Sequence, residues 1–262
     1  MKFTPDTLAN AHERMRQIKA QSTGGFFTNY FRQEMVGTQI LTVATDRSVL
    51  VINDEHDFFR LYFFTNYVRD FEQILRASEY PGDVVAGYLT RAEDKNITEA
   101  FQRSGFNPIA NYRRMVSFQL PKQRPNAALE YASAADLNRL HEHLFRVFNK
   151  YTDHLPTKSR LLGYIENRQV IVIRHEQRIG GAVCFQLQGP RVNYNYIYSL
   201  SDNPLDFLQL QNNFYGVMHQ REIGAGFLWV NRSNERLAAL YQSSGWRFDG
   251  LEDFFYFRSS LN

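Results

Sequence analysis

The stretch that decides the fold is LWVNRSNERLAALYQSSGWRFDG, residues 228–250. It opens with the apolar run of a buried strand, continues with apolar residues at helical spacing, and passes through Gly245-Trp246 toward a further strand. RAEDKNITEAFQRSGF, residues 91–106, aligns on residues 231–246 without a gap, at an offset of 140. The two copies predict a duplicated αβ unit.

The rest of the chain alternates between helical and strand periodicity around these two segments. In the first half we expect a helix from Thr4-Pro5, a helix through Val68 and a third that ends at Gly105, with strands at 39–45, 48–53, 58–65, 83–90 and near 112–119. In the second half, Ser133 and Asp136 predict a capping box. Further helices are expected near 161–165, along Phe207–Val217 and over 233–244, with strands at 169–174, 179–187, 191–199, 227–230 and 254–257. PKQRPNA, residues 121–127, is interpreted as a linker between domains 1–120 and 127–262.

Composition excludes several classes of protein. With 44% hydrophobic and 22% charged residues among 262, the chain can build a globular core. A net charge of +3 without a basic block gives no reason to expect DNA as a partner. The single cysteine, Cys184, excludes an intramolecular disulfide, and no metal site is expected. No apolar run approaches the ~20 residues that span a bilayer, and the first residues lack an apolar signal core, so we expect a cytoplasmic protein that does not bind membranes.

A strand followed by a helix with Asn234, Tyr241, Gly245 and Trp246 resembles the GNAT superfamily of acyl-CoA-dependent N-acyltransferases. The resemblance implies an α/β fold of two GNAT-like domains, each a mixed, mostly antiparallel sheet flanked by helices. It also implies transfer of an acyl group, acetyl foremost, from a CoA thioester to a small-molecule or peptide amine. The second domain would carry the activity, and the first would be a degenerate copy.

The resemblance assigns roles on the donor side of the site. Tyr241 would protonate the departing thiolate, and Asn234 would hold the pantetheine arm or its bound water. Leu200 and Ser201, where strand 191–199 ends, would contact the cofactor. Two structural alternatives stay open, because Tyr241 also fits a core aromatic on its helix and Asn234 also fits a helix cap.

The acceptor would lie against two other segments. The loop 151–156 supplies Asp153 and His154 as candidates for substrate contact or for the base. In the strand RVNYNYIYS, Tyr194 and Tyr196 are expected on one face with Tyr198, as a polar wall of the acceptor pocket. The alternatives are a solvated loop and a strand whose tyrosines pack and reach the surface.

The second half departs from the family where a glycine-rich loop binds the CoA pyrophosphate. After strand 191–199 the chain reads LSDNPLDFLQLQ, without glycine and with Asp202 and Asp206, which would repel a pyrophosphate. REIGAG, from Arg221, matches the motif literally but lies too close to Asn234, and is interpreted as a helix stop capped by Gly224.

The first half departs further, with Phe101 at the position of Tyr241 and Asp94 at that of Asn234. These departures leave three alternatives to an acetyl-CoA enzyme. The donor could be an acyl carrier protein or an aminoacyl-tRNA, or the chain could be a non-catalytic binding module of GNAT shape.

Overall fold

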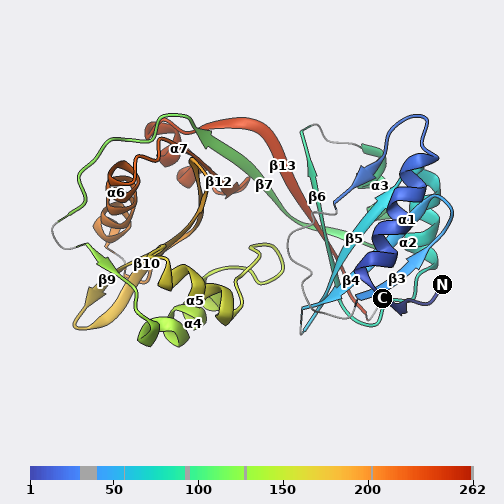
Figure 1. The fold of residues 1–262 in the computed structure, drawn as a ribbon, viewed down its shortest axis with the longest axis horizontal. Coiled ribbons are helices and arrows are strands. Elements are labelled where there is room, and N and C mark those ends of the chain that lie inside the picture. Colours follow the sequence, from blue (N-terminus) through green and yellow to red (C-terminus); the bar gives the residue numbers. More distant parts are fainter. Residues whose placement is uncertain (30–39, 56, 92–94, 127–128, 202, 261–262) are drawn as a thin grey trace. The chain divides into compact units, whose positions relative to one another are not determined.

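The computed structural model describes residues 1–29, 40–55, 57–91, 95–126, 129–201 and 203–260, and its contacts divide the chain into two units (Figure 1). Unit 1 comprises Met1–Tyr112 and Leu251–Asn262, and unit 2 comprises Arg113–Gly250. Within the described residues, none of the helices combines the length and apolar character needed to cross a membrane.

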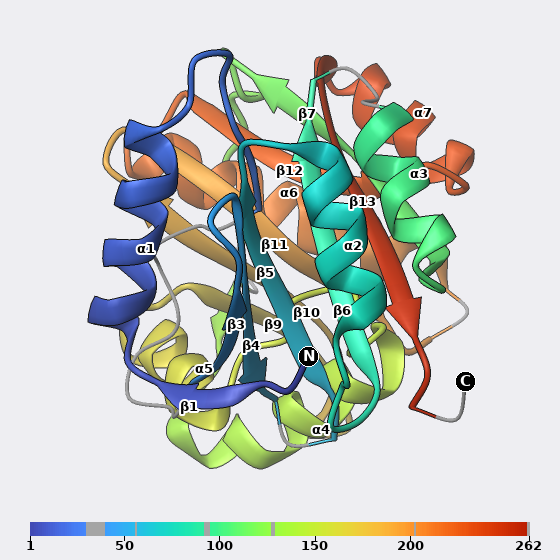
Figure 2. The same cartoon turned by 90° about the vertical axis from the view of Figure 1, so that its right-hand side faces the viewer.

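Unit 1 is a sheet with helices on both faces (Figure 2). Its elements are β1 (Thr4–Asp6), α1 (Leu8–Ala20), β2 (Phe27–Thr28), β3 (Ile40–Ala44), β4 (Ser48–Asp54), β5 (Phe59–Thr65), α2 (Val68–Ala77), β6 (Val84–Thr90) and α3 (Lys95–Arg103). The strands follow the order β1-β3-β4-β5-β6, and β5 and β6 are its parallel pair. One apolar core lies under α2 and α3, and a second lies under α1.

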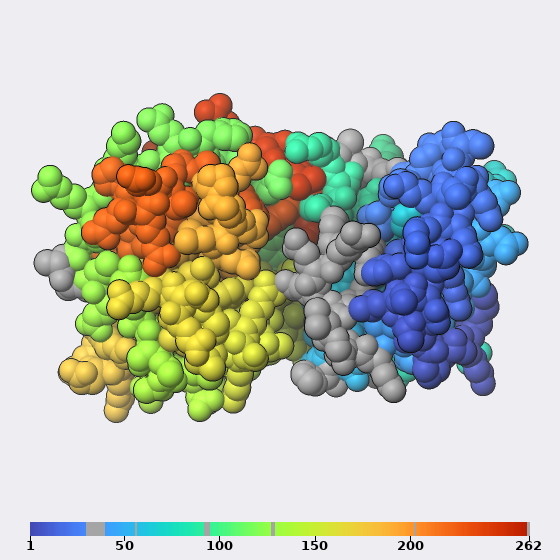
Figure 3. Space-filling model, viewed as in Figure 1, coloured from blue at the N-terminus to red at the C-terminus, as the bar shows by residue number. Residues whose placement is uncertain are grey.

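Unit 2 repeats this plan. Its elements are β8 (Glu130–Tyr131), a short 3-10 turn (Ala134–Asp136), α4 (Leu137–Val147), α5 (Lys158–Glu166), β9 (Val170–His175), β10 (Arg178–Gln188), β11 (Arg191–Ser199), α6 (Pro204–Gln220), β12 (Ala225–Asn231) and α7 (Glu235–Ser243). The order is β12-β11-β10-β9-β8, with β11 and β12 parallel. One core lies under α6 and α7 and another under α4 and α5. Side chains of α4, α5 and α6 cover much of the face of unit 2 that Figure 3 shows. The expected duplicated α/β fold, with mixed and mostly antiparallel sheets, is confirmed.

Two long strands, β7 (Asn107–Ser117) and β13 (Arg247–Arg258), contribute residues to both units. Within unit 2, the Arg114 guanidinium pairs with the Asp249 carboxylate, and within unit 1 the Asn111 side chain donates to Glu252. β13 turns at Gly250, which has a φ of +82°, and then runs antiparallel to β6. The units therefore differ from the expected domains 1–120 and 127–262, which assign each of these strands whole to one domain.

Most of the expected elements are found, but the N-terminal one begins later. Thr4 and Pro5 belong to β1 and pair with β3, so the prediction that they open a helix is wrong. Thr7 caps α1 instead, because its Oγ1 accepts a hydrogen bond of 3.2 Å from the backbone N–H of Asn10. The capping box of Ser133 and Asp136 is confirmed, although it opens the 3-10 turn that leads into α4.

Candidate functional site

In unit 2, the parallel strands β11 and β12 pair over only part of their length. The ladder runs from Arg191–Ala225 to Tyr194–Leu228, whereas β11 continues to Ser199 and β12 to Asn231. Beyond the Tyr194–Leu228 pair, the backbone groups that face the other strand have no ladder partners in it. We call this place the unit 2 fork. An extended ligand chain can pair with backbone groups of this kind.

A β-bulge lies at the start of the unit 2 fork. Cys184 of β10 pairs with Tyr196, but the next residue, Phe185, pairs with Tyr194, so Asn195 is an extra residue in β11. Since successive residues of β10 point to opposite faces, the bulge puts Tyr194 and Tyr196 on opposite faces as well. The expectation that Tyr194, Tyr196 and Tyr198 share one face is therefore wrong for Tyr194.

Tyr194 lies in the core under α6 and α7, next to Tyr241. Its ring stacks on that of Phe214 at 4.2 Å between centroids and meets the ring of Tyr241 edge-on at 5.9 Å. The Tyr194 hydroxyl is buried beside the hydroxyl of Tyr241. Burial, followed by the nearby hydroxyls of Tyr241 and Tyr215, raises the pKa of Tyr194 well above its usual value.

Tyr241 is 3% exposed, as expected for an aromatic residue on the core side of α7. Burial raises its pKa above the usual value, and Tyr215 adds to this effect. The Tyr215 hydroxyl in turn accepts hydrogen bonds from Trp246 Nε1 at 2.8 Å and from Gln211 Nε2 at 3.1 Å. At neutral pH, Tyr241 therefore keeps its proton, which is the protonation state that a general acid requires.

On the other face of β11, Tyr196 lies in the core under α4 and α5 and contacts the loop between these helices. Its hydroxyl donates to the backbone oxygens of His154 at 2.7 Å and of Asp153 at 3.1 Å. The Asp153 carboxylate accepts a hydrogen bond of 2.7 Å from the backbone N–H of Asn149, which shapes the loop. The structure thus brings three of the predicted acceptor residues together and separates Tyr194 from them.

The N-terminus of α6 holds a carboxylate of the chain itself. Asn203 caps the helix by accepting from the backbone N–H of Leu205 at 3.1 Å. In the first turn, Asp206 is 5% exposed and bonds to His175 Nε2 at 2.7 Å and to the Ser201 hydroxyl. The hydrogen bond from Ser201 lowers the pKa of Asp206 below its usual value, and the interaction with His175 lowers it further. Burial acts in the opposite direction and is outweighed.

This arrangement uses Ser201 in an internal contact. The backbone N–H of Leu200 donates to the backbone oxygen of Gly180 at 2.7 Å. Leu200 itself is 37% exposed. Asp202 lies outside the described residues. Because a helix N-terminus that already holds a carboxylate repels a second anion, the chain does not fit a diphosphate at this place. Contact of Leu200 and Ser201 with a cofactor stays a prediction.

Asn234 and Arg221, two residues that the sequence singled out, both lie at helix ends. Asn234 is exposed and caps α7, because its Oδ1 accepts from the backbone N–H of Leu237 at 3.1 Å. Arg221 is the C-terminal cap of α6, and Glu222 has a φ of +58°. The literal motif REIGAG is therefore a helix stop as predicted, but Arg221 takes the cap position expected for Gly224.

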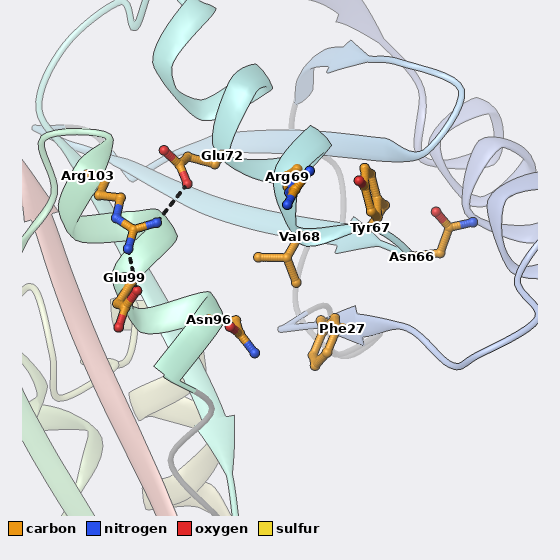
Figure 4. Close-up of a pocket in the computed structure, with 9 residues that line it drawn as sticks. All are labelled: Phe27, Asn66, Tyr67, Val68, Arg69, Glu72, Asn96, Glu99 and Arg103. Carbon is orange, nitrogen blue, oxygen red and sulfur yellow. Dashed lines mark hydrogen bonds and ion pairs between the residues drawn. The ribbon is translucent and has the colours of Figure 1, made fainter.

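The corresponding positions of unit 1 carry different chemistry. Phe101 lies in an aromatic cluster, stacked on Tyr256 at 4.7 Å, while Asp94 lies outside the described residues. A pocket of about 410 Å³ lies between the first turns of α2 and the side of α3 that carries Asn96, Glu99 and Arg103 (Figure 4). Phe27 lines one side of this pocket, and Arg103 is ion-paired there with Glu72 and Glu99. Across the described ranges, no three His, Cys, Asp or Glu side chains come together to hold a metal ion.

Known structures share this architecture over the whole chain. A tandem GNAT protein from the clavulanic acid biosynthesis pathway is 10% identical, with a TM-score of 0.54 over 98% of each chain. The chain has the tandem GNAT fold. An acetyltransferase of the GNAT family from Colwellia psychrerythraea matches 99% of this chain and 100% of its own, at 9% identity and a TM-score of 0.55.

A third match is a GCN5-related N-acetyltransferase from Sphaerobacter thermophilus, with a TM-score of 0.60, 12% identity, and coverage of 87% of this chain and 83% of its own. No protein-family model matches the sequence, and no curated protein matches it either. At these identities the similarity establishes the GNAT fold alone. The substrates have to be inferred from the residues of the site.

Proposed function

We propose that unit 2 is an N-acyltransferase that moves an acyl group, acetyl foremost, from a thioester to an amine. The observation that carries this proposal is the unit 2 fork, where the β11–β12 ladder ends at Tyr194–Leu228 beside the extra residue Asn195. The amides of a pantetheine arm can pair with the backbone groups of the fork as an added strand does.

The bulge supports the chemical step. Asn195 is left out of the pairing between β10 and β11, so its peptide group is not committed to that ladder. A backbone N–H near the acyl carbonyl can stabilise the oxyanion that forms when the amine attacks. When this intermediate collapses, the C–S bond breaks and Tyr241 donates a proton to the sulfur. The raised pKa of Tyr241 keeps that proton available at neutral pH.

The amine acceptor is assigned to the other face of β11, where Tyr196 contacts the loop of Asp153 and His154. His154 is exposed and has a φ of +47°, which turns the loop at this residue. In this proposal, Asp153 and His154 contact the amine or take its proton. Tyr194, next to Tyr241, belongs to the donor side.

The Asp206 carboxylate favours a second form of the proposal, in which the donor is recognised through its pantetheine arm. A thioester on an acyl carrier protein has such an arm without the nucleotide diphosphate of CoA. If the donor is instead an aminoacyl-tRNA, or if the chain is a non-catalytic binding module, neither acetyl-CoA nor acetyl-pantetheine acylates an amine.

The test compares acetyl-CoA with acetyl-pantetheine by titration calorimetry and by thiol release with a panel of amines. If the arm alone is recognised, the two dissociation constants agree within about tenfold, or about 1.4 kcal/mol. Tyr241→Phe should lower thiol release by ~10²-fold or more and leave binding unchanged, because the ring and its packing are kept. Unchanged turnover in Tyr241→Phe would remove Tyr241 as the acid, and binding of neither compound at millimolar concentration would reject a pantetheine-based donor.

A further inference from the structure

Unit 1 contains a fork of the same kind between its parallel strands. The ladder of β5 and β6 joins Phe59–Val84, Arg60–Val85 and Leu61–Ala86, although β5 continues to Thr65 and β6 to Thr90. We call the place beyond Leu61–Ala86 the unit 1 fork. Buried backbone N–H and C=O groups there need other partners, since leaving such groups unpaired is costly.

The chain itself supplies these partners on the β5 side. β2 pairs antiparallel with β5, with Phe27 opposite Thr65 and Thr28 opposite Phe64. The Thr28 hydroxyl also donates to the backbone oxygen of Phe63 at 2.7 Å. β2 thus occupies the edge of β5 that β6 has left.

The next residue, Asn29, bridges both strands at the branch point. Its Nδ2 donates to Leu61 O at 3.0 Å and to Gly87 O at 2.6 Å, and its Oδ1 accepts from the backbone N–H of Phe63 at 2.7 Å. Leu61 ends the ladder on β5, and Gly87 is the first residue of β6 beyond it. With 5% of its surface exposed, the side chain uses both N–H donors and its oxygen within the fork.

We propose that Phe27–Asn29 is a built-in ligand of unit 1, which closes the unit 1 fork to any extended amide-containing ligand. The Asn29 amide makes the same kinds of hydrogen bond that the amide of such a ligand would make. In unit 2, no described strand pairs with β11 on this side beyond Tyr194. The proposal concerns unit 1 alone and holds whether or not unit 2 transfers an acyl group.

The first test removes the bridge from the full-length chain. Asn29→Ala leaves Leu61 O, Phe63 N–H and Gly87 O without these partners, so we expect the Tm to fall by roughly 6–12 °C and the Phe63 amide to exchange its hydrogen faster. Asn66→Ala is the matched control, because the Asn66 side chain donates a single bond of 3.1 Å to Ile18 O. We expect that control to lose about 2–4 °C. Equal losses in the two variants, with unchanged exchange at Phe63, would overturn the proposal.

If Asn29→Ala does not fold, Thr28→Val provides a milder change, since it removes the hydroxyl that bonds to Phe63 O. Faster exchange along β5 supports the proposal, and unchanged exchange contradicts it.

The second test uses acetyl-pantetheine at millimolar concentration as the probe, with hydrogen exchange read by peptide. We expect the exchange of β5 and β6 in the wild-type protein to stay unchanged, whatever happens at β11. Added protection at Phe63–Thr65, or two bound equivalents per chain, would show that the unit 1 fork admits a ligand. Failure of the acyltransferase proposal would instead appear as no response at β11, so the two failures are distinguishable.

Discussion

The variant Gly216→Ala tests how the segment 121–126, which precedes β8, packs on α6. A Cβ at this position would lie 2.4 Å from Pro125 N, 2.6 Å from Pro125 Cα and 2.9 Å from the carbonyl carbon of Arg124. All three are backbone atoms, so the segment must move as a whole. Gly163 in α5 is the matched control, because nothing lies within 4 Å of its added Cβ.

The magnitude follows from three contributions. Replacing glycine by alanine inside an open helix stabilises it by about 1 kcal/mol. Overpacking against atoms that cannot rotate away costs about 1–3 kcal/mol. Moving the segment also breaks the hydrogen bond of 3.0 Å from the Asn126 N–H to Asn213 Oδ1, which costs about 1 kcal/mol. We therefore expect Gly216→Ala to lower the free energy of unfolding by about 1–3 kcal/mol and Gly163→Ala to raise it by about 0.5–1 kcal/mol.

Urea unfolding monitored by tryptophan fluorescence is the suitable assay. The chain has two tryptophans, Trp229 and Trp246, and both belong to unit 2. Their emission therefore reports the unfolding of the unit that carries both glycines. A Gly216→Ala variant as stable as Gly163→Ala would refute the reasoning, because it would show that the 121–126 segment does not press on α6.

Two pH predictions accompany this one. The pKa of Asp206 is lowered in the folded protein, so its stabilising effect is present above about pH 4 and is lost as the pH falls through the folded value. Asp206→Asn should therefore differ most from the wild type in urea unfolding at pH 7 and least at pH 3, and a constant difference would contradict the assignment. Burial raises the pKa of the half-buried Asp253 to about 7, against the opposing effects of Arg60 and the Tyr88 N–H. The contribution of Asp253 to wild-type stability should then fall as the pH rises from about 4 to 7. Asp253→Asn should therefore have a higher Tm than the wild type at pH 8 but not at pH 5, and thermal unfolding at the two pH values tests this difference.

Local patterns were sufficient where neighbours in the sequence are also neighbours in space. The stripe of Val68, Phe71 and Leu75 predicts α2 because a helix buries residues three and four positions apart. RVNYNYIYS predicts β11 with its bounds, and Ser133 with Asp136 predicts the capping box. Phe101 in place of Tyr241 already indicates that the two halves differ in chemistry.

The faces of β11 could not be predicted in this way. Strict alternation puts Tyr194 and Tyr196 on one face, and only the pairing of β10 with β11 shows that Asn195 is an extra residue. A bulge depends on the partner strand, which the sequence of β11 does not specify. Tyr194 therefore lies in the core that contains Tyr241, while Tyr196 lies on the opposite face of β11.

Sequence by itself determined the duplicated αβ plan, the helix that carries Asn234 and Tyr241, and the absence of a glycine-rich loop after β11. These features are written in periodicity and residue type within single segments. The tertiary structure decided which groups meet at the start of α6 and at the unit 1 fork. At the start of α6, Asp206 bonds to His175, which lies 31 residues earlier in the sequence. Asn29 bonds to the backbone oxygen of Gly87, which lies 58 residues later. Contacts between distant segments depend on how strands pair and part, and no local pattern in the chain encodes where a parallel ladder ends.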